Sequence, residues 1–153
     1  MFLSSTTNTL DAKGRVSVPA SFRATCSGAG YDGIVVWPSL DGEYLEGGDL
    51  SILDYYQGAL DQMDMYDEGR EALELVIFGE GQKLGFDSTG RVGLPQAFRD
   101  YAGLDGQVTF IGRGRKFEIW NADKHELRKA ELREKARLNR HRMKPAQSSQ
   151  SLS

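Results

Sequence analysis

A 13-residue stretch occurs twice in this chain and constrains its fold more than any other feature. DAKGRVSVPASFR spans residues 11–23 and DSTGRVGLPQAFR spans residues 87–99, with Asp, Gly, Arg, Val, Pro, Phe and the final Arg at the same seven places. The copies are 76 residues apart, about half of the 153-residue chain. Half a chain of this size buries little core alone, so we expect the halves to pair into one compact unit.

Each copy has the residue pattern of a turn between two strands. Residues 5–11 are rich in Thr and residues 15–19 alternate Val with smaller residues, so we predict a β-hairpin around each turn. Asp at the entry and Gly at the fourth place favour a type I turn whose closing residue has positive φ. The proline ends the strand and opens a short helical turn, which should direct Phe22 and Phe98 inward.

Further strands are predicted at residues 33–37, 107–112 and 116–120, the last two separated by the turn sequence GRGR. The apolar run at residues 75–78 is also predicted to be a strand, which leads into the second motif after a helical start at residue 71. We assign seven residues to core packing: Val16, Phe22, Ile52, Leu53, Leu75, Val92 and Phe98.

Two helices are predicted beside these strands. Asp49 is a candidate N-cap for a helix with one apolar stripe at Ile52, Leu53, Tyr56, Leu60 and Met63, and an acidic opposite face at Asp54, Asp61, Asp64 and Asp67. The second helix is capped by Asn121 or Asp123, the latter forming a variant capping box with Glu126. Because it is charged nearly all round, it should dock on a neighbour along a narrow stripe of Leu127, Ala130, Leu132, Ala136 and Leu138.

The predicted fold is therefore α+β, with two pseudo-symmetric β-hairpin halves that form a small barrel-like sheet unit with peripheral helices. The first half spans residues 1–70 with the acidic helix, and the second spans residues 71–143 with the basic C-terminal helix. Residues 144–153 lack core-forming side chains and are predicted to be a disordered tail.

The net charge of -3 hides a strong asymmetry along the chain. Residues 1–30 carry +2 and residues 111–153 carry +7, whereas residues 31–70 carry -9 and residues 71–110 carry -3. A positively charged face could thus exist on the same molecule as an acidic segment that faces another direction.

No apolar run approaches the roughly 20 residues of a membrane span and the N-terminus lacks the pattern of a secretory signal, so we expect a cytoplasmic protein.

The repeated turn can bind an anion. Asp11 can accept hydrogen bonds from turn amides and pair with Arg15, as Asp87 can with Arg91. A guanidinium held in this way is oriented toward phosphate or the acceptor edge of guanine. For one isolated copy a purely structural turn is the better explanation, and it is the repetition that favours binding. Lys13 adds a cation to the first copy only, which suggests that the first copy binds and the second mainly supports the fold.

The segments MFLSSTTNTLDAKGRVSVPASFR and LDGQVTFIGRGRKFEIWN, together with the two D-x-x-x-R elements, resemble the MraZ family of bacterial transcriptional regulators, built from two AbrB/SpoVT-like halves. The likeness extends from residue 1 to about residue 142. It implies a nucleoid-associated, double-stranded-DNA-binding regulator, a repressor by expectation, at the promoter of the division and cell-wall gene cluster. It also implies recognition of short direct repeats by ring-shaped homo-oligomers.

The positions of this chain that match the DNA-contacting motif of the family are listed here: Asp11, Lys13, Gly14 and Arg15 in the first copy, and Asp87, Gly90 and Arg91 in the second. Neither the resemblance nor the composition implies a cofactor, a metal, a small-molecule substrate or an enzymatic activity. The alternative from another class is an oligomeric protein-interaction scaffold without a DNA role, in which basic C-terminal helices bind acidic middle helices.

The features that could indicate acid–base catalysis, a phosphate-binding loop or a calcium site are weaker than the repeated motif. His125 and His141 are interpreted as solvated helix residues, and an Asp11–Asp87 acid–base dyad is disfavoured because each carboxylate has an arginine four residues away. GRGRK at residues 112–116 lacks P-loop spacing and indicates a turn with exposed cations that could still touch DNA. The acidic residues 61–68 lack the glycine of a calcium loop, and the single Cys26 is expected to be buried.

Overall fold

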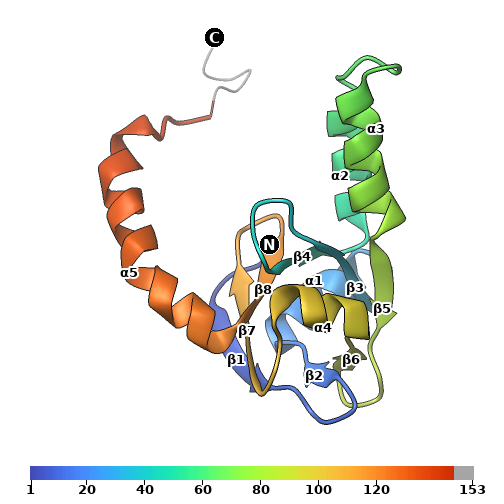
Figure 1. Cartoon of the computed structure of the whole chain (residues 1–153), viewed down its shortest axis with the longest axis vertical. Coiled ribbons are helices and arrows are strands. Elements are labelled where there is room, and N and C mark those ends of the chain that lie inside the picture. The colour runs from blue at the N-terminus through green and yellow to red at the C-terminus, as the bar shows by residue number, and fades with distance from the viewer. Residues whose placement is uncertain (147–153) are drawn as a thin grey trace.

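The computed structural model describes residues 1–146 as an antiparallel sheet with a short β-ribbon and five α-helices (Figure 1). The elements in chain order are β1 (Ser5–Thr9), β2 (Arg15–Ser17), α1 (Ala20–Gly28), β3 (Gly33–Pro38), β4 (Leu45–Gly48), α2 (Ser51–Leu60), α3 (Glu68–Glu74), a π-helical turn (Leu75–Gly79), β5 (Gln82–Gly85), β6 (Arg91–Gly93), α4 (Gln96–Ala102), β7 (Gln107–Gly112), β8 (Phe117–Asn121), α5 (Ala122–Asn139) and a 3₁₀ turn (Arg140–Arg142).

The main sheet has the strand order β1-β7-β8-β4-β3-β5, and every neighbouring pair is antiparallel. β2 and β6 form a separate two-stranded ribbon. Within residues 1–146 the edge strands β1 and β5 do not pair with each other, so the sheet is open and the predicted barrel is wrong. The α+β class and the peripheral helices are confirmed, whereas the AbrB-like pseudo-symmetry and the boundaries at residues 70 and 143 stay predictions.

The β-hairpins predicted around the two motifs are also wrong. β1 pairs with β7, from Ser5 opposite Ile111 to Thr9 opposite Gln107, while β2 pairs with β6, with Val16 opposite Val92. The turn of each motif therefore leads from the main sheet into the ribbon. The reason is tertiary: pairing the two copies through β2 and β6 places Val16 opposite Val92 and buries both in the main core.

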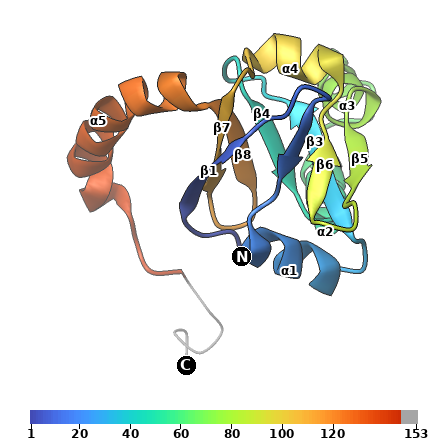
Figure 2. The ribbon, with the colours of Figure 1, turned by 90° about the horizontal axis from the view of Figure 1, so that it is seen from below.

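The main core is enclosed by the sheet, the β2–β6 ribbon and the helices α1 and α4, which lie at opposite ends of the strands in Figure 2. At its centre Phe2, Phe22 and Phe117 pack edge to face or tilted, with ring centroids 5.0–5.4 Å apart. β3 is buried on both faces because its side chains alternate: Ile34 and Val36 enter this core, while Val35 and Trp37 pack against α2.

Six of the seven predicted core residues lie in or against these two cores, with Leu53 half-buried, but Leu75 is 62% exposed. The predicted strand at residues 75–78 is instead a π-helical turn that continues α3. Of that apolar run only Ile77 is buried, and the strand that pairs with β3 begins later, at Gln82. Asp49 accepts a hydrogen bond from the Ser51 amide at the start of α2 (2.9 Å), and α2 ends at Leu60, before Met63.

α5 leaves the sheet at one flank and extends away from the body, while α2 and α3 project from the opposite flank (Figure 1). The side chain of Asn121 caps α5 by accepting from the Lys124 amide (3.1 Å), so Asp123 and Glu126 do not form the capping box. His125 is the buried residue of this helix, and the predicted stripe remains outside the core, with Leu127 85% exposed. Most of the predicted disordered tail, residues 147–153, lies outside the described residues.

Candidate nucleic-acid interface

The turn of the first motif is closed by its own aspartate. Asp11 Oδ1 accepts hydrogen bonds from the backbone amides of Lys13 (2.9 Å) and Arg15 (2.8 Å), and Asp11 Oδ2 accepts from the Arg15 Nε (2.8 Å). Gly14 donates its amide to the Asp11 carbonyl and has φ +80°, the left-handed conformation that the sequence predicted. The Arg15 side chain is 38% exposed, so its guanidinium is fixed at one nitrogen while the side chain remains accessible.

The second motif repeats this geometry. Asp87 Oδ1 accepts from the amides of Thr89 (2.9 Å) and Arg91 (3.0 Å), and Asp87 Oδ2 accepts from the Arg91 Nε (2.9 Å). Gly90 has φ +79°. The threonine hydroxyl, which stands in the place of Lys13, also donates to Asp87 (2.9 Å) and so makes a local contact instead of presenting a charge.

The β2–β6 ribbon brings the two motifs together. Arg15 lies opposite Gly93, and Arg91 lies opposite Ser17, so each arginine faces a small residue on the outer side of the ribbon while Val16 and Val92 face the core. The Arg91 Nη1 also approaches Asp11 Oδ2 at 3.9 Å, which connects the second arginine to the first turn.

The last arginine of each motif also belongs to this site, and the sequence interpretation gave it no role. The Arg99 guanidinium lies directly over Gly14, and that of Arg23 lies over Gly90, so each copy covers the turn of the other. Their Nε atoms donate to the carbonyls of Leu94 (3.0 Å) and Val18 (3.1 Å), respectively. The signal that could have found them was present, because this arginine recurs at the same place in both copies.

We call this set of residues the cationic tip: Asp11, Lys13, Arg15, Arg23, Asp87, Arg91 and Arg99. It contains five cations and two carboxylates, and within residues 1–146 no carboxylate lies within ion-pair distance of Lys13, Arg23 or Arg99. The tip lies at the β2–β6 end of the molecule, away from the far ends of α2, α3 and α5 (Figure 1).

The two carboxylates of the cationic tip are held in their charged form. Hydrogen bonds from the backbone amide of Arg15, then from its guanidinium and the Lys13 amide, lower the pKa of Asp11 below its ordinary value. The amide of Arg91 has the same effect on Asp87, whose pKa is also lowered, with further hydrogen bonds from Thr89. Neither carboxylate is suited to general acid–base chemistry at neutral pH, and both can orient guanidinium groups permanently.

Two of the three cations of the GRGRK sequence, Arg113 and Lys116, have a different role. GRGRK forms the predicted turn between β7 and β8, with Gly114 at φ +81°. Arg113 pairs with Glu118 (2.6 Å), and Lys116 pairs with Glu46, a second glutamate that is almost fully buried in the sheet. These cations therefore neutralise buried carboxylates in the sheet.

The interpretation of His125 as a solvated residue is wrong, because it is only 8% exposed and packs 6.2 Å from the Trp120 ring, between centroids. Burial lowers its pKa, with the neighbouring cations Arg128 and Lys129 acting in the same direction. His141 is exposed as predicted, and Cys26 is fully buried. Among the described residues no cluster of His, Cys, Asp or Glu has the arrangement of a metal site.

In the described part of the chain, every helix is too short or too polar to cross a membrane.

Comparison with known proteins identifies a set of relatives. The profile of a family described as "MraZ protein, putative antitoxin-like" matches residues 77–144. A protein named "Transcriptional regulator MraZ" from Methylocella silvestris is 40% identical over 136 residues, which cover 89% of this chain and 83% of that protein. Relatives with the same name from Phenylobacterium zucineum (39% over 137 residues, 90% and 85% covered) and Caulobacter vibrioides (40% over 137 residues, 90% and 87% covered) are similarly close.

Proposed function

Because this chain belongs to the MraZ family, we propose that it is a sequence-specific DNA-binding regulator of transcription that contacts DNA through the cationic tip. The observation that carries this proposal is the charge of the tip. Two motif arginines are fixed by carboxylates behind them, and three further cations lack a carboxylate partner among the described residues. Fixed guanidinium groups suit phosphate oxygens and the O6/N7 edge of guanine.

The two motifs contribute unequally to this contact. Lys13 extends the first turn with an exposed charge, whereas Thr89 directs its hydroxyl back to Asp87. The first copy therefore supplies the main DNA-contacting residues: Asp11, Lys13, Gly14 and Arg15. The second copy, with Asp87, Gly90 and Arg91, sets the position of the ribbon and adds one phosphate contact.

A single tip binds DNA weakly, so the proposal includes self-association. Each phosphate neutralised releases counterions and contributes a slope of about -0.9 to the dependence of log K on log salt concentration. In a ring-shaped homo-oligomer, later contacts become intramolecular and evenly spaced direct repeats are favoured over isolated sites. The target is the promoter of the division and cell-wall gene cluster, where binding represses transcription, and the protein acts in the cytoplasm on the nucleoid.

The test is a fluorescence-anisotropy titration of the DNA fragment upstream of the protein's own gene, at two salt concentrations. Arg15→Ala should weaken binding at least tenfold and make the salt slope shallower by about 0.9 for each tip engaged, while Arg91→Ala has a smaller effect. Lys144→Ala is the matched control, since it removes one exposed cation far from the cationic tip.

Folding and subunit mass are measured for each variant by circular dichroism and light scattering. Unchanged, salt-sensitive promoter binding by a folded and assembled Arg15→Ala protein would reject the assignment. It would instead favour the interaction scaffold, whose function does not depend on the cationic tip.

A further inference from the structure

We propose that Arg99 and Arg23 are positioning residues for DNA binding, each of which holds the DNA-contacting turn of the opposite motif. Arg99, at the end of the second motif, fixes Lys13 and Arg15 in the first, and Arg23 does the same for Arg91 in the second. This inference rests on the proposed function and names the residues that hold its binding site in place. Three observations carry it: a closed set of contacts around each turn glycine, the helices that present the two arginines, and a difference between the two turns.

Three contacts connect Gly14, Leu94 and Arg99 in a closed circuit. The Gly14 carbonyl accepts a hydrogen bond from the Leu94 amide (2.8 Å), and the Leu94 carbonyl accepts one from the Arg99 Nε (3.0 Å). The Arg99 guanidinium then lies over Gly14, where an added Cβ would be 2.8 Å from the Arg99 Cζ. The first turn therefore cannot shift without breaking a contact to the second motif.

The second turn has the same closed circuit with the motifs exchanged. The Gly90 carbonyl accepts from the Val18 amide (3.1 Å), and the Val18 carbonyl accepts from the Arg23 Nε (3.1 Å). The Arg23 guanidinium lies over Gly90, with its Cζ 2.6 Å from an added Cβ. Both turn glycines are buried as a result. Any side chain at either glycine would occupy the place of the guanidinium that covers it.

Two helices of the core present these arginines. Arg99 follows Phe98 in α4, Arg23 follows Phe22 in α1, and both phenylalanines are buried in the main core. In Figure 2 α4 and α1 lie at opposite ends of the strands, so the two guanidinium groups approach the ribbon from opposite ends. The position of each turn is thus tied to the core through one arginine, and a site held by a helix is more precise than one held by a loop alone.

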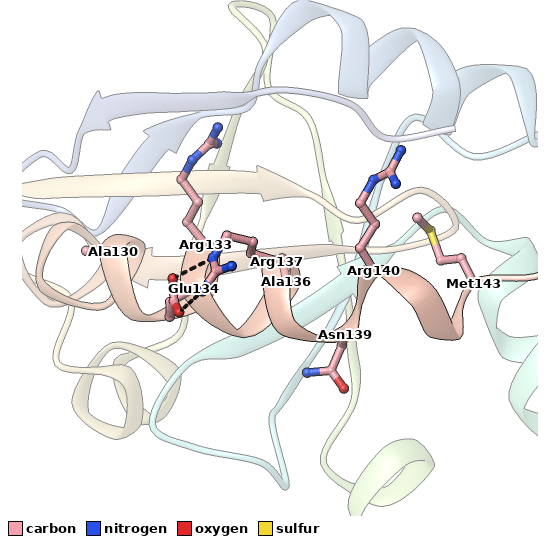
Figure 3. A pocket seen from close by; sticks show the side chains of 8 residues that line it. All are labelled: Ala130, Arg133, Glu134, Ala136, Arg137, Asn139, Arg140 and Met143. Carbon is pink, nitrogen blue, oxygen red and sulfur yellow. Dashed lines mark hydrogen bonds and ion pairs between the residues drawn. The ribbon is translucent and has the colours of Figure 1, made fainter.

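These contacts differ from those of a surface arginine that pairs with a carboxylate. On α5, Arg137 donates to Glu134, three residues away, from Nε (3.1 Å) and from Nη2 (2.6 Å) (Figure 3). Arg99 and Arg23 instead donate to backbone carbonyls five residues earlier, and no carboxylate of residues 1–146 lies within ion-pair distance of them. Their partners are the backbone groups that contact the opposite turn, as a positioning role requires.

The two turns depend on this cover to different degrees. In the second turn the Thr89 hydroxyl donates to Asp87 (2.9 Å), and the Lys13 side chain makes no corresponding bond among the described residues. The first turn therefore has fewer internal hydrogen bonds, and it also carries the main DNA-contacting cations. Loss of Arg99 should thus weaken DNA binding more than loss of Arg23.

The first test examines the two turns without DNA. Hydrogen–deuterium exchange of the whole chain, read by mass spectrometry, follows peptides that cover residues 11–15 and 87–91. Arg99→Ala should speed exchange in residues 11–15, and Arg23→Ala in residues 87–91, at least about fivefold in each case, because the turn that loses its cover opens more often. Faster exchange only in the motif that carries the substitution, or equal exchange in both motifs, would overturn the proposal.

The second test is the fluorescence-anisotropy titration of the promoter fragment, with folding of each variant checked by circular dichroism. Arg99→Ala should weaken binding at least about fivefold, whereas the matched control Arg23→Ala, which removes the same contacts in the other motif, should weaken it less than about twofold. In the Arg15→Ala background, Arg99→Ala should add about twofold or less, because Arg99 acts through the first turn. A fully additive loss would mean that Arg99 contacts phosphate by itself, and would overturn the proposal.

Arg99→Lys separates position from charge. Lysine keeps the positive charge but lacks the planar guanidinium and the Nε that hold the turn, so promoter affinity should stay as low as that of Arg99→Ala. Recovery of the wild-type affinity by Arg99→Lys would contradict the positioning role, since a phosphate contact needs only the charge.

The outcomes separate this inference from the proposed function. Unchanged promoter binding by a folded Arg15→Ala protein would reject the proposed function, and with it the DNA role of Arg99, whatever the exchange data show. Weakened binding by Arg15→Ala, together with wild-type exchange and wild-type binding in Arg99→Ala, would overturn this inference alone.

Discussion

Replacing Gly14 with alanine should destabilise the turn of the first motif. Gly14 has φ +80°, and a Cβ built there lies 2.8 Å from the Arg99 Cζ. A left-handed conformation costs an alanine roughly 1–2 kcal/mol. Displacing Arg99 also removes its hydrogen bond to the Leu94 carbonyl (3.0 Å), worth about 1 kcal/mol. The expected loss in free energy of unfolding is about 2–3 kcal/mol.

For a chain of this length that loss corresponds to a fall in Tm of about 4–12 °C. The assay is thermal and urea unfolding followed by circular dichroism, with all proteins at one concentration because self-association shifts apparent stability. Gly93→Ala is the matched control: this ribbon glycine has no positive φ, and no atom lies within 4 Å of an added Cβ. Its free energy of unfolding should change by less than about 1 kcal/mol, in the stabilising direction.

An equal effect of the two substitutions would refute the argument that the turn requires a left-handed residue covered by an arginine. Gly14→Ala should also weaken promoter binding under conditions where it is fully folded, because it moves the Arg99 guanidinium. Gly93→Ala should leave that binding unchanged.

Three further results are expected. The pKa values of Asp11 and Asp87 are lowered in the folded state, so the stabilisation by these carboxylates is present above the unfolded pKa of about 3.9 and is lost as pH falls through the folded pKa values. In the double variant Asp11→Asn with Asp87→Asn, the free energy of unfolding in urea should therefore depend less on pH between about pH 2 and pH 6 than it does in the wild type. Glu118→Gln, which removes the buried carboxylate that pairs with Arg113 and Arg128, should cost about 1–3 kcal/mol in urea unfolding, against less than about 0.5 kcal/mol for the exposed Glu131→Gln. Burial raises the pKa of Cys26 to about 12, so iodoacetamide at about pH 8 should label it only in the urea-unfolded protein, as read by mass spectrometry.

The local features of this protein were determined by the sequence. The left-handed glycines, the aspartates that accept from the turn amides, and the proline-opened helices that bury Phe22 and Phe98 are confirmed where the motif predicted them. These features depend on contacts among residues four or five positions apart, and such contacts are encoded by residue type and spacing. The repeat of the motif also indicated that two turns would share one architecture.

The tertiary structure alone decided which strands pair. β1 reaches β7 and β2 reaches β6 across half of the chain or more. The β2–β6 pairing buries Val16 and Val92, whereas the polar strand β1 is held by its backbone pairing with β7 and by the hydrogen bond between the Thr7 and Thr109 hydroxyls. Long-range packing also buried His125 and placed Arg23 and Arg99 over the glycine of the opposite motif. A short pattern specifies how the backbone turns, whereas the partner of each strand and the neighbours of each arginine depend on which apolar surfaces the whole chain can remove from water.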